Sequence, residues 1–189
     1  MTTITFWESN YKHGGNSGSG SYGILCDFKT DVLNTFITAN NITSILDLGC
    51  GDGNQIKKIL TYKYVGLDII PSAVEKCKLM FKNDTTKTFE CSQAYSFSDI
   101  FDMTISLDVI YHIVEDENYY QYILNLFKCS KRWVIIYSSN YNGSKVQHMH
   151  PRKFTDDLEK LVPDFKLVKK IPQVYPDISS ADFYIYERI

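Results

Sequence analysis

The strongest constraint on the fold is a short apolar stretch that runs directly into a glycine-rich turn. Residues 42–48 are mostly apolar and partly β-branched, and residues 49–53 follow as Gly-Cys-Gly-Asp-Gly. This pattern predicts a buried strand and a tight turn, because glycine adopts backbone conformations that a β-carbon disfavours. With a short helix predicted over residues 54–61, the order strand, glycine turn, helix is typical of nucleotide-binding α/β domains.

Strands and helices are predicted to alternate along most of the chain. The further strands are expected at residues 62–68, 86–91, 101–107 and 132–137, and the helices at residues 28–39, 71–81, 115–129 and 154–161. This alternation predicts an α/β fold, a mostly parallel sheet with helices on both faces. The last two strands, at 165–171 and 181–187, have only nine residues between them. Because a parallel crossover needs a dozen or more residues, they predict an antiparallel hairpin at one edge.

A chain of 189 residues suits one domain. We divide it into an N-terminal lid and helix segment, residues 1–40, and a Rossmann-like core, residues 41–189. Within the first part, residues 14–23 are almost entirely glycine, serine and asparagine. This segment is either a flexible linker or a mobile loop that closes over a ligand.

Composition narrows the classes of partner. The formal net charge is −2, which argues against nucleic acid or an anionic membrane surface as a partner. The five cysteines include no C-x-x-C pair, so neither a disulfide framework nor a zinc site is predicted, and reduced thiols are expected. The first residues contain no apolar stretch of the length of a signal peptide or membrane span, so we expect a cytoplasmic protein.

Two acids point to the kind of ligand. Asp68 ends the second strand 21 residues after Asp47, close to the ~20-residue spacing of an acid that bonds ribose hydroxyls. Asp47 opens the glycine turn, where it would repel a pyrophosphate and attract a cationic amino group, such as that of S-adenosylmethionine. No G-K-[ST] sequence follows the turn, which excludes a P-loop.

Three segments resemble the motifs of class I S-adenosylmethionine-dependent methyltransferases. They are ILDLGCGDG at 45–53, YVGLDIIPSAVEKC at 64–77 and FDMTISLDVIYHIVED at 101–116, and the match extends from about residue 42 to 137. The resemblance implies a Rossmann-like, seven-stranded sheet with a reversed last strand, with S-adenosylmethionine as cofactor and S-adenosylhomocysteine as product.

The resemblance also assigns cofactor contacts. Asp47, Gly49 and Gly51 would hold the methionine end, Asp68 the ribose, and Ile69 would lie against the adenine. Many members have an acid after the third strand that bonds the adenine amino group; this chain has Cys-Ser-Gln-Ala at 91–94, so that Ser92 or Gln93 would have to serve. The remaining cofactor-binding candidates are Cys50, Gly53, Asn54 and Leu107.

The catalytic candidates follow the fourth strand. Asp108 ends that strand and His112 follows four residues later, so the two side chains would share a face if the segment is helical. We expect one of them to be a general base and the other to orient it or to bind substrate. The alternative is that Asp108 caps a helix and His112 is a packing residue.

Polar and aromatic residues elsewhere predict an acceptor pocket. Tyrosine, asparagine, histidine and arginine side chains suit a polyhydroxylated ligand; the candidates are Tyr11, His13, Tyr111, Asn140, His148, His150 and Arg152. His148 and His150 lie two residues apart without nearby carboxylates, so no metal site is predicted.

The N-terminal run at 11–23, the segment SLDVIYHIVED and the late His-Pro-Arg sequence are similar to methyltransferases found with glycosyltransferases in glycan assembly. This resemblance implies O-methylation of a sugar hydroxyl on a glycan or nucleotide sugar, with glycosyltransferase domains as partners. The absence of an Asn/Asp-Pro-Pro-Tyr sequence after the fourth strand argues against methylation of DNA or glutamine. The alternatives are another small metabolite, a protein side chain, or a catalytically silent methyltransferase-like subunit.

Overall fold

The sheet has the predicted architecture. The computed structural model describes residues 2–189, so Met1 of the predicted N-terminal segment lies outside them. Seven strands form one sheet in the order β3-β2-β1-β4-β5-β7-β6. Their bounds are β1 Ser44–Leu48, β2 Lys63–Asp68, β3 Lys87–Cys91, β4 Phe101–Leu107, β5 Ser130–Ser138, β6 Phe165–Ile171 and β7 Asp182–Arg188.

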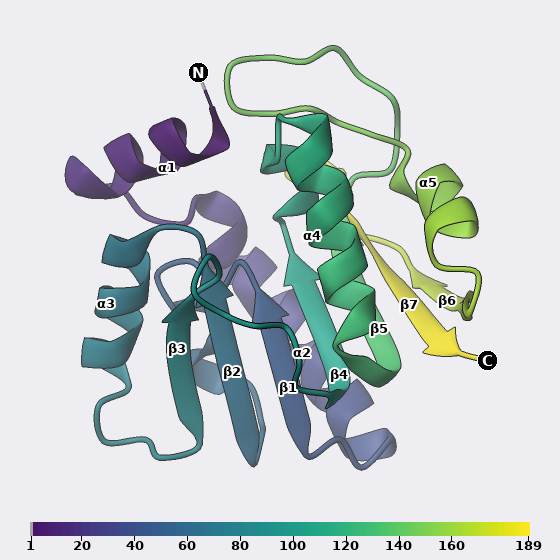
Figure 1. Ribbon diagram of the computed structural model, residues 1–189, viewed down its shortest axis with the longest axis horizontal. Helices are drawn as coiled ribbons and strands as arrows, with labels where there is room; N and C mark the ends of the chain where they lie inside the picture. The colour runs from purple at the N-terminus through teal and green to yellow at the C-terminus, as the bar shows by residue number, and fades with distance from the viewer. Residues whose placement is uncertain (1) are drawn as a thin grey trace.

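Strands β1 to β5 are parallel, and β7 runs antiparallel to both β5 and β6, as the short connection between the last two strands predicts. Since β2 and β4 lie on either side of β1, the chain reverses its direction of winding between β1 and β4. Ligands of open α/β sheets bind at such a reversal, beyond the carboxyl ends of the strands. That edge of the sheet is uppermost in Figure 1.

Helices cover both faces of the sheet. Four of them are α2 Gly23–Ala39, α3 Pro71–Met80, α4 Asp116–Lys128 and α5 Phe154–Leu161. Apolar residues of α2 and α3 pack on one face, with Ile45 and Ile105, whereas those of α4 and α5 pack on the other, with Leu46 and Val134. Alternate residues of β1 thus enter two separate cores, which is why the central strands have such high apolar content.

Three local features differ from the sequence prediction. A helix, α1 Thr3–Lys12, precedes the glycine- and serine-rich segment, and α2 begins at Gly23 rather than near residue 28. The helix predicted over 54–61 is only a 3-10 turn, Gln55–Lys58. Ile56 and Ile59 are both buried, and a spacing of three suits a 3-10 turn better than an α-helix.

The connection between β3 and β4, residues 92–100, contains no helix and crosses the front of the sheet in Figure 1. Its Tyr95 and Phe97 side chains pack against the core on that face. All five cysteines are free, and four of them are buried. Within the described part of the chain, no helix has the length and hydropathy needed to cross a bilayer.

Candidate functional site

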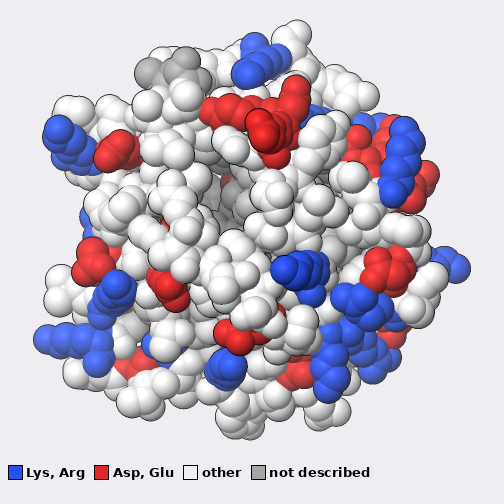
Figure 2. Space-filling view, in the orientation of Figure 1, with Lys and Arg blue, Asp and Glu red and all other residues white. Residues whose placement is uncertain are grey.

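A cavity of about 270 Å³ lies at the carboxyl ends of β1, β2 and β4, where the winding of the sheet reverses. Figure 2 shows a hollow on this face of the molecule, between α1 and α4. The cavity is lined by α1, the glycine turn, the residues after β2, β3 and β4, and one side of α4. Three aspartates, Asp47, Asp68 and Asp108, belong to this lining, and no lysine or arginine of the described residues does. The lining therefore favours a cationic ligand.

The glycine turn, residues 47–53, and Asp68 lie beneath the cavity, and we call them the floor; residues 47–51 and Asp68 line the cavity itself. Gly49 and Gly51 have φ angles of 91° and 58°, in the left-handed region that disfavours other residues. The backbone N–H groups of Gly49 and Cys50 donate to the Leu67 carbonyl at 2.7 and 2.9 Å, which ties the turn to β2. The backbone itself thus lines the cavity at Gly49 and Gly51, where no side chain stands between it and a ligand.

Gly53 and Asn54 do not line the cavity, which corrects the prediction for both residues. A β-carbon on Gly53 would lie 3.0 Å from Cys77 Sγ, so this glycine permits close packing of the turn against α3. The Asn54 side chain donates to the Ser21 carbonyl at 2.7 Å and accepts from Lys57, so it holds the N-terminal segment instead of facing the cavity.

Asp47 has one oxygen bonded and one free. Tyr64, from β2, donates to Asp47 Oδ2 at 2.6 Å, whereas Asp47 Oδ1 is buried and has no hydrogen-bond partner. Burial raises the pKa of the Asp47 carboxyl to about 7, although the Tyr64 hydrogen bond opposes that shift. A buried carboxylate oxygen without a partner is costly. The residue therefore fits a ligand that brings an amino group.

Asp68 bridges the two neighbouring turns. Its Oδ2 accepts from Gly51 N and its Oδ1 from Ile70 N, both at 2.9 Å. Burial raises the pKa of Asp68 to about 6, and the hydrogen bonds from the backbone oppose the shift. Each carboxylate oxygen keeps a second acceptor site, which is what a pair of ribose hydroxyls requires.

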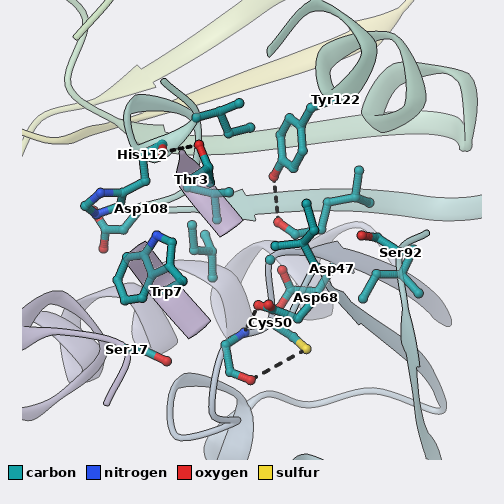
Figure 3. Close-up of a pocket in the computed structure, with 18 of the residues that line it drawn as sticks. Thr3, Trp7, Ser17, Asp47, Cys50, Asp68, Ser92, Asp108, His112 and Tyr122 are labelled. Atoms are coloured by element: carbon teal, nitrogen blue, oxygen red, sulfur yellow. Dashed lines mark hydrogen bonds between the residues drawn. The ribbon is translucent and has the colours of Figure 1, made fainter. Parts of the chain in front are cut away.

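The other predicted cofactor contacts also border the cavity. Ile69, Ser92 and Gln93 lie on it near the end of β3, and Cys50 and Leu107 lie on it near the glycine turn. In Figure 3 Ser92 lies on one side of Asp47 and Asp68, and Trp7, Asp108 and His112 lie on the other. The two aspartates thus occupy the middle of the cavity. We call the side of Ser92 the β3 end and the side of His112 the β4 end.

Sequence reasoning missed the contribution of α4. Asn118, Gln121, Tyr122 and Asn125 line the cavity, and the Tyr122 hydroxyl donates to the Leu48 carbonyl at 2.6 Å. Their spacing places them along one side of the helix. These polar residues form a stripe beside the buried stripe of Tyr119, Ile123 and Leu126, and that pattern in the sequence could have indicated that this side of the helix faces the cavity.

Asp108 is held by two donors at the β4 end. Its φ angle is 59°, Lys29 Nζ lies 2.6 Å from its Oδ2, and the Tyr111 hydroxyl donates to its Oδ1 at 2.9 Å. The segment that follows is a 3-10 turn, Ile110–His112, with no side-chain cap, so the alternative of Asp108 as a helix cap is wrong. Lys29 was not predicted. Its place on the buried stripe of α2, four residues from both Leu25 and Leu33, was the signal that could have revealed it.

His112 lines the cavity but is not paired with Asp108. Its Nδ1 lies 3.0 Å from the His148 carbonyl, and its ring meets that of Trp7 edge to face with centroids 5.0 Å apart. A carbonyl accepts only, so Nδ1 carries the proton and the neutral ring keeps Nε2 as a proton acceptor. Burial lowers the pKa of His112, which favours this neutral form. Since no hydrogen bond joins the two side chains in residues 2–189, the prediction that one orients the other is corrected.

The predicted acceptor residues do not gather at one place. Tyr11 lines the cavity, and its hydroxyl lies 2.9 Å from Ser17 Oγ. Tyr111 bonds Asp108 from outside the cavity lining, and His148 stacks on Phe6 with centroids 4.3 Å apart. His13 is exposed and lies 2.8 Å from the Ser9 carbonyl, away from the cavity.

The pocket expected around Asn140, His150 and Arg152 does not form. Asn140 donates to Thr155 at 3.0 Å, and Arg152 donates to the Ile113 carbonyl at 2.8 Å and to Asp116 at 2.6 Å. The guanidinium of Arg152 also lies over the Tyr119 ring, and His150 lies 3.6 Å from Asp116. The donors of Asn140 and Arg152 are thus used within the fold, and none of the three residues lines the cavity, which corrects the prediction of a substrate pocket there.

The N-terminal segment forms the roof of the cavity, which we define as residues 3–22. At one end the Thr3 hydroxyl donates to Glu115 Oε2 at 2.7 Å and accepts from Val114 N at 3.0 Å. At the other end Ser17 N donates to Asp52 Oδ2 at 3.0 Å, and Ser17 Oγ accepts from Asp52 N at 2.8 Å. The roof is therefore fastened both to the link before α4 and to the glycine turn.

The cavity also carries no arrangement for a metal ion: among the described residues, no three histidine, cysteine or acidic side chains gather as metal ligands would.

Comparisons with known proteins agree with this geometry. Residues 39–184 match the family described as "Methyltransferase domain". The N-methyltransferase NodS from Bradyrhizobium japonicum WM9, in complex with S-adenosyl-L-homocysteine, aligns with a TM-score of 0.73 and 13% identity over 100% of this chain and 99% of that chain. Magnesium protoporphyrin IX methyltransferase from Synechocystis PCC 6803, with bound S-adenosylmethionine, aligns with a TM-score of 0.67 and 15% identity over 98% of this chain and 85% of that chain.

A third structure, an S-adenosylmethionine-dependent methyltransferase from Clostridium acetobutylicum ATCC 824, aligns with a TM-score of 0.67 and 13% identity over 84% of this chain and 90% of that chain. No curated protein matches the sequence. The family match spans most of the chain, and the cavity has the acids and the glycine turn that a sulfonium nucleoside needs. The chain therefore belongs to the methyltransferase domain family and is a class I S-adenosylmethionine-dependent methyltransferase.

Proposed function

We propose that this methyltransferase acts on a hydroxyl group of a small uncharged acceptor, a sugar hydroxyl in the first instance, with His112 as the general base. The observation that carries the proposal is the environment of His112: its Nδ1 lies 3.0 Å from a backbone carbonyl, burial lowers its pKa, and it lines the cavity. A hydroxyl acceptor needs a base for its proton, whereas transfer to a neutral amine needs none before the methyl group arrives.

The cofactor would lie along the floor. Asp47 would accept from its amino group through the free Oδ1, Asp68 would accept from the ribose hydroxyls, and Ile69, Ser92 and Gln93 would surround the adenine at the β3 end. When bound, S-adenosylmethionine supplies an electrophilic methyl group on a positively charged sulfur. This orientation directs the reacting end toward the β4 end of the cavity, where Asp108 and His112 lie.

The β4 end favours an acceptor without negative charge. Its walls include Trp7, Val109 and Ile113, and its one acid, Asp108, is already paired. A nucleotide sugar would bring a diphosphate, for which this lining offers no lysine or arginine. Among the acceptors that the sequence resemblance implies, an uncharged glycan hydroxyl is therefore preferred. Glycosyltransferase partners remain a prediction of that resemblance.

In the proposed reaction His112 Nε2 would take the proton of the acceptor hydroxyl as its oxygen bonds to the methyl carbon, while the bond from that carbon to sulfur breaks and the neutral thioether S-adenosylhomocysteine leaves. We also propose that residues 1–40 provide the lid of the single domain. The support for this proposal is the contact of the roof with both sides of the cavity.

A second candidate is methylation of an amine-bearing metabolite. The acids of the cavity lining favour it, since they attract an ammonium group and no lysine or arginine of the described residues lines the cavity. A panel of matched alcohols and amines decides between the two candidates. Turnover confined to amines would overturn the hydroxyl proposal, and a chain that binds S-adenosylhomocysteine but turns over neither class would fit the silent subunit.

Replacing His112 by asparagine tests the base directly. We expect kcat to fall by about two to four orders of magnitude, the usual contribution of a positioned base, while the affinity for S-adenosylhomocysteine is kept. The control is His13→Asn, because His13 is an exposed histidine outside the cavity. Turnover of His112→Asn at the rate of this control would contradict the proposal.

A further inference from the structure

One lysine is fully buried beside the cavity. Lys29, in α2, has a side-chain exposure of 0%, and of residues 2–189 it is the one lysine or arginine in the buried class. Its Nζ lies 2.6 Å from Asp108 Oδ2 and 5.0 Å from the centroid of the Tyr137 ring. Burying an ammonium group is costly unless it is closely paired, so the fold depends on Asp108 as the partner of Lys29.

The backbone around Asp108 is arranged to keep the pair together. Asp108 takes a left-handed conformation, its N–H donates to the Tyr137 carbonyl at 2.9 Å, and Tyr111 donates to its second oxygen. Gly20, in the roof, passes so close that a β-carbon there would lie 2.7 Å from Asp108 Oδ2. Each carboxylate oxygen of Asp108 therefore has a donor within the protein.

The three aspartates of the cavity differ in this respect. Asp47 and Asp68 form no ion pair in the described part of the chain, and Asp47 keeps an oxygen without a partner. These two acids face groups that the cofactor and its demethylated product share, the amino group and the ribose. Asp108 lies at the β4 end, where the cofactor carries a positive sulfur and the product a neutral one.

We propose that Lys29 is a positioning residue that neutralises Asp108, so that the carboxylate at the β4 end does not serve as a counter-ion for the sulfonium. During transfer the positive charge on sulfur disperses, so an uncompensated carboxylate there would stabilise the charged reactant state more than the transition state. The pair thus keeps the enzyme from holding its cofactor too tightly relative to its product. The inference rests on the proposed placement of the reacting end of the cofactor at the β4 end.

Substitutions of Lys29 and of Asp108 are expected to change the cofactor preference in opposite directions, which gives a test of the proposal. Dissociation constants for S-adenosylmethionine and S-adenosylhomocysteine are measured by calorimetry at pH 8 for the whole chain. In Lys29→Met the preference for the sulfonium form over the thioether rises by about tenfold, because one negative charge is no longer compensated. In Asp108→Asn, which leaves the lysine charge alone, that preference falls below that of the unmodified chain.

Two further variants complete the design. Lys29→Arg keeps the charge and therefore keeps the preference, and the double variant Lys29→Met with Asp108→Asn removes both charges and restores it. With turnover, Lys29→Met lowers kcat and lowers KM for the cofactor together, which a merely structural defect would not do.

The proposal is overturned if the single variants leave the preference unchanged or shift it in the same direction. Should Lys29→Met not fold, Asp108→Asn decides alone: a reduced preference supports the proposal and an unchanged one rejects it. An unmodified chain that binds neither compound would instead speak against the cofactor site itself, so the two failures are distinguishable.

Discussion

The floor and the roof of the cavity are built by different means. The floor follows from backbone geometry: a strand, three left-handed glycines and two buried acids anchored by N–H and O–H donors. The roof is a helix and a glycine-rich loop held by hydrogen bonds between Thr3 and Glu115 at one end and between residues 17–22 and Asp52 and Asn54 at the other. We therefore expect the floor to supply most of the affinity for the cofactor, and the roof to open at a lower free energy than the floor.

The strongest test of this difference is removal of a floor acid. Asp68→Ala deletes the acceptor of two backbone N–H groups and of the ribose hydroxyls. We expect the affinity for S-adenosylhomocysteine to fall by about a hundredfold, equivalent to roughly 2.7 kcal/mol. Isothermal calorimetry measures it, with Asp99→Ala as control, since that aspartate is exposed on the connection between β3 and β4. A loss below threefold would mean that the floor does not hold the nucleoside.

The pH dependence sharpens the role of Asp47. Its pKa of about 7 and that of Asp68, about 6, both exceed the ordinary value of 3.8. The stability that these groups contribute to the free protein is thus complete below about pH 4 and is lost as the pH rises through 6 to 7. Binding of an amino group needs the ionised Asp47 carboxylate, so the affinity for the ligand rises over the pH range in which the stability of the free protein falls.

We therefore expect S-adenosylhomocysteine to bind about tenfold more weakly at pH 6 than at pH 8. Calorimetry at pH 6 in buffers of different ionisation enthalpy should also detect proton release on binding. In Asp47→Asn the dependence should be largely lost. An affinity that is flat from pH 6 to pH 8 in the unmodified chain would contradict the assignment of Asp47.

The smallest effect is expected at the roof. Thr3→Val keeps the shape of the side chain but removes the hydrogen bonds of its hydroxyl to Glu115 Oε2, Val114 N and the His112 carbonyl, while the backbone N–H of residue 3 still donates to Glu115. The free energy of unfolding should fall by about 1 kcal/mol, and amide hydrogen exchange should quicken in α1 while the floor stays protected. Thr35→Val is the matched control, because Thr35 is an exposed threonine in α2. Equal exchange in both variants would show that Thr3 does not fasten the roof.

The difference between floor and roof also explains which parts of the structure could be predicted from the sequence. Periodicity and short-range spacing predicted the strands, the helices α3, α4 and α5, the glycine turn and the two floor acids. Helix α1 was missed since only Thr3 and Tyr11 of its residues are buried, which leaves little apolar pattern. The fate of Arg152 and of Asn140 could not be read, because their partners, Asp116 and Thr155, are set by tertiary contacts.

The pairing of Asp108 also depends on a tertiary contact that the sequence does not show. Its place at the end of β4 was predicted, but its partner comes from α2, 79 residues away in sequence. A spacing rule within one segment favoured His112 as its neighbour, whereas the chain conformation at Asp108 turns the carboxylate toward Lys29. Long-range pairs of this kind need the fold before they can be named.

The helix-free connection between β3 and β4 has a practical consequence for engineering. Ser98 and Asp99 are exposed there, and the chain at these positions takes part in no helix or strand. Exposed, irregular segments tolerate foreign sequence best. A fluorescent reporter inserted between these two residues would sit just before Phe101, the first residue of β4, at the edge of the sheet opposite to the cavity, with the secondary structure on either side left intact.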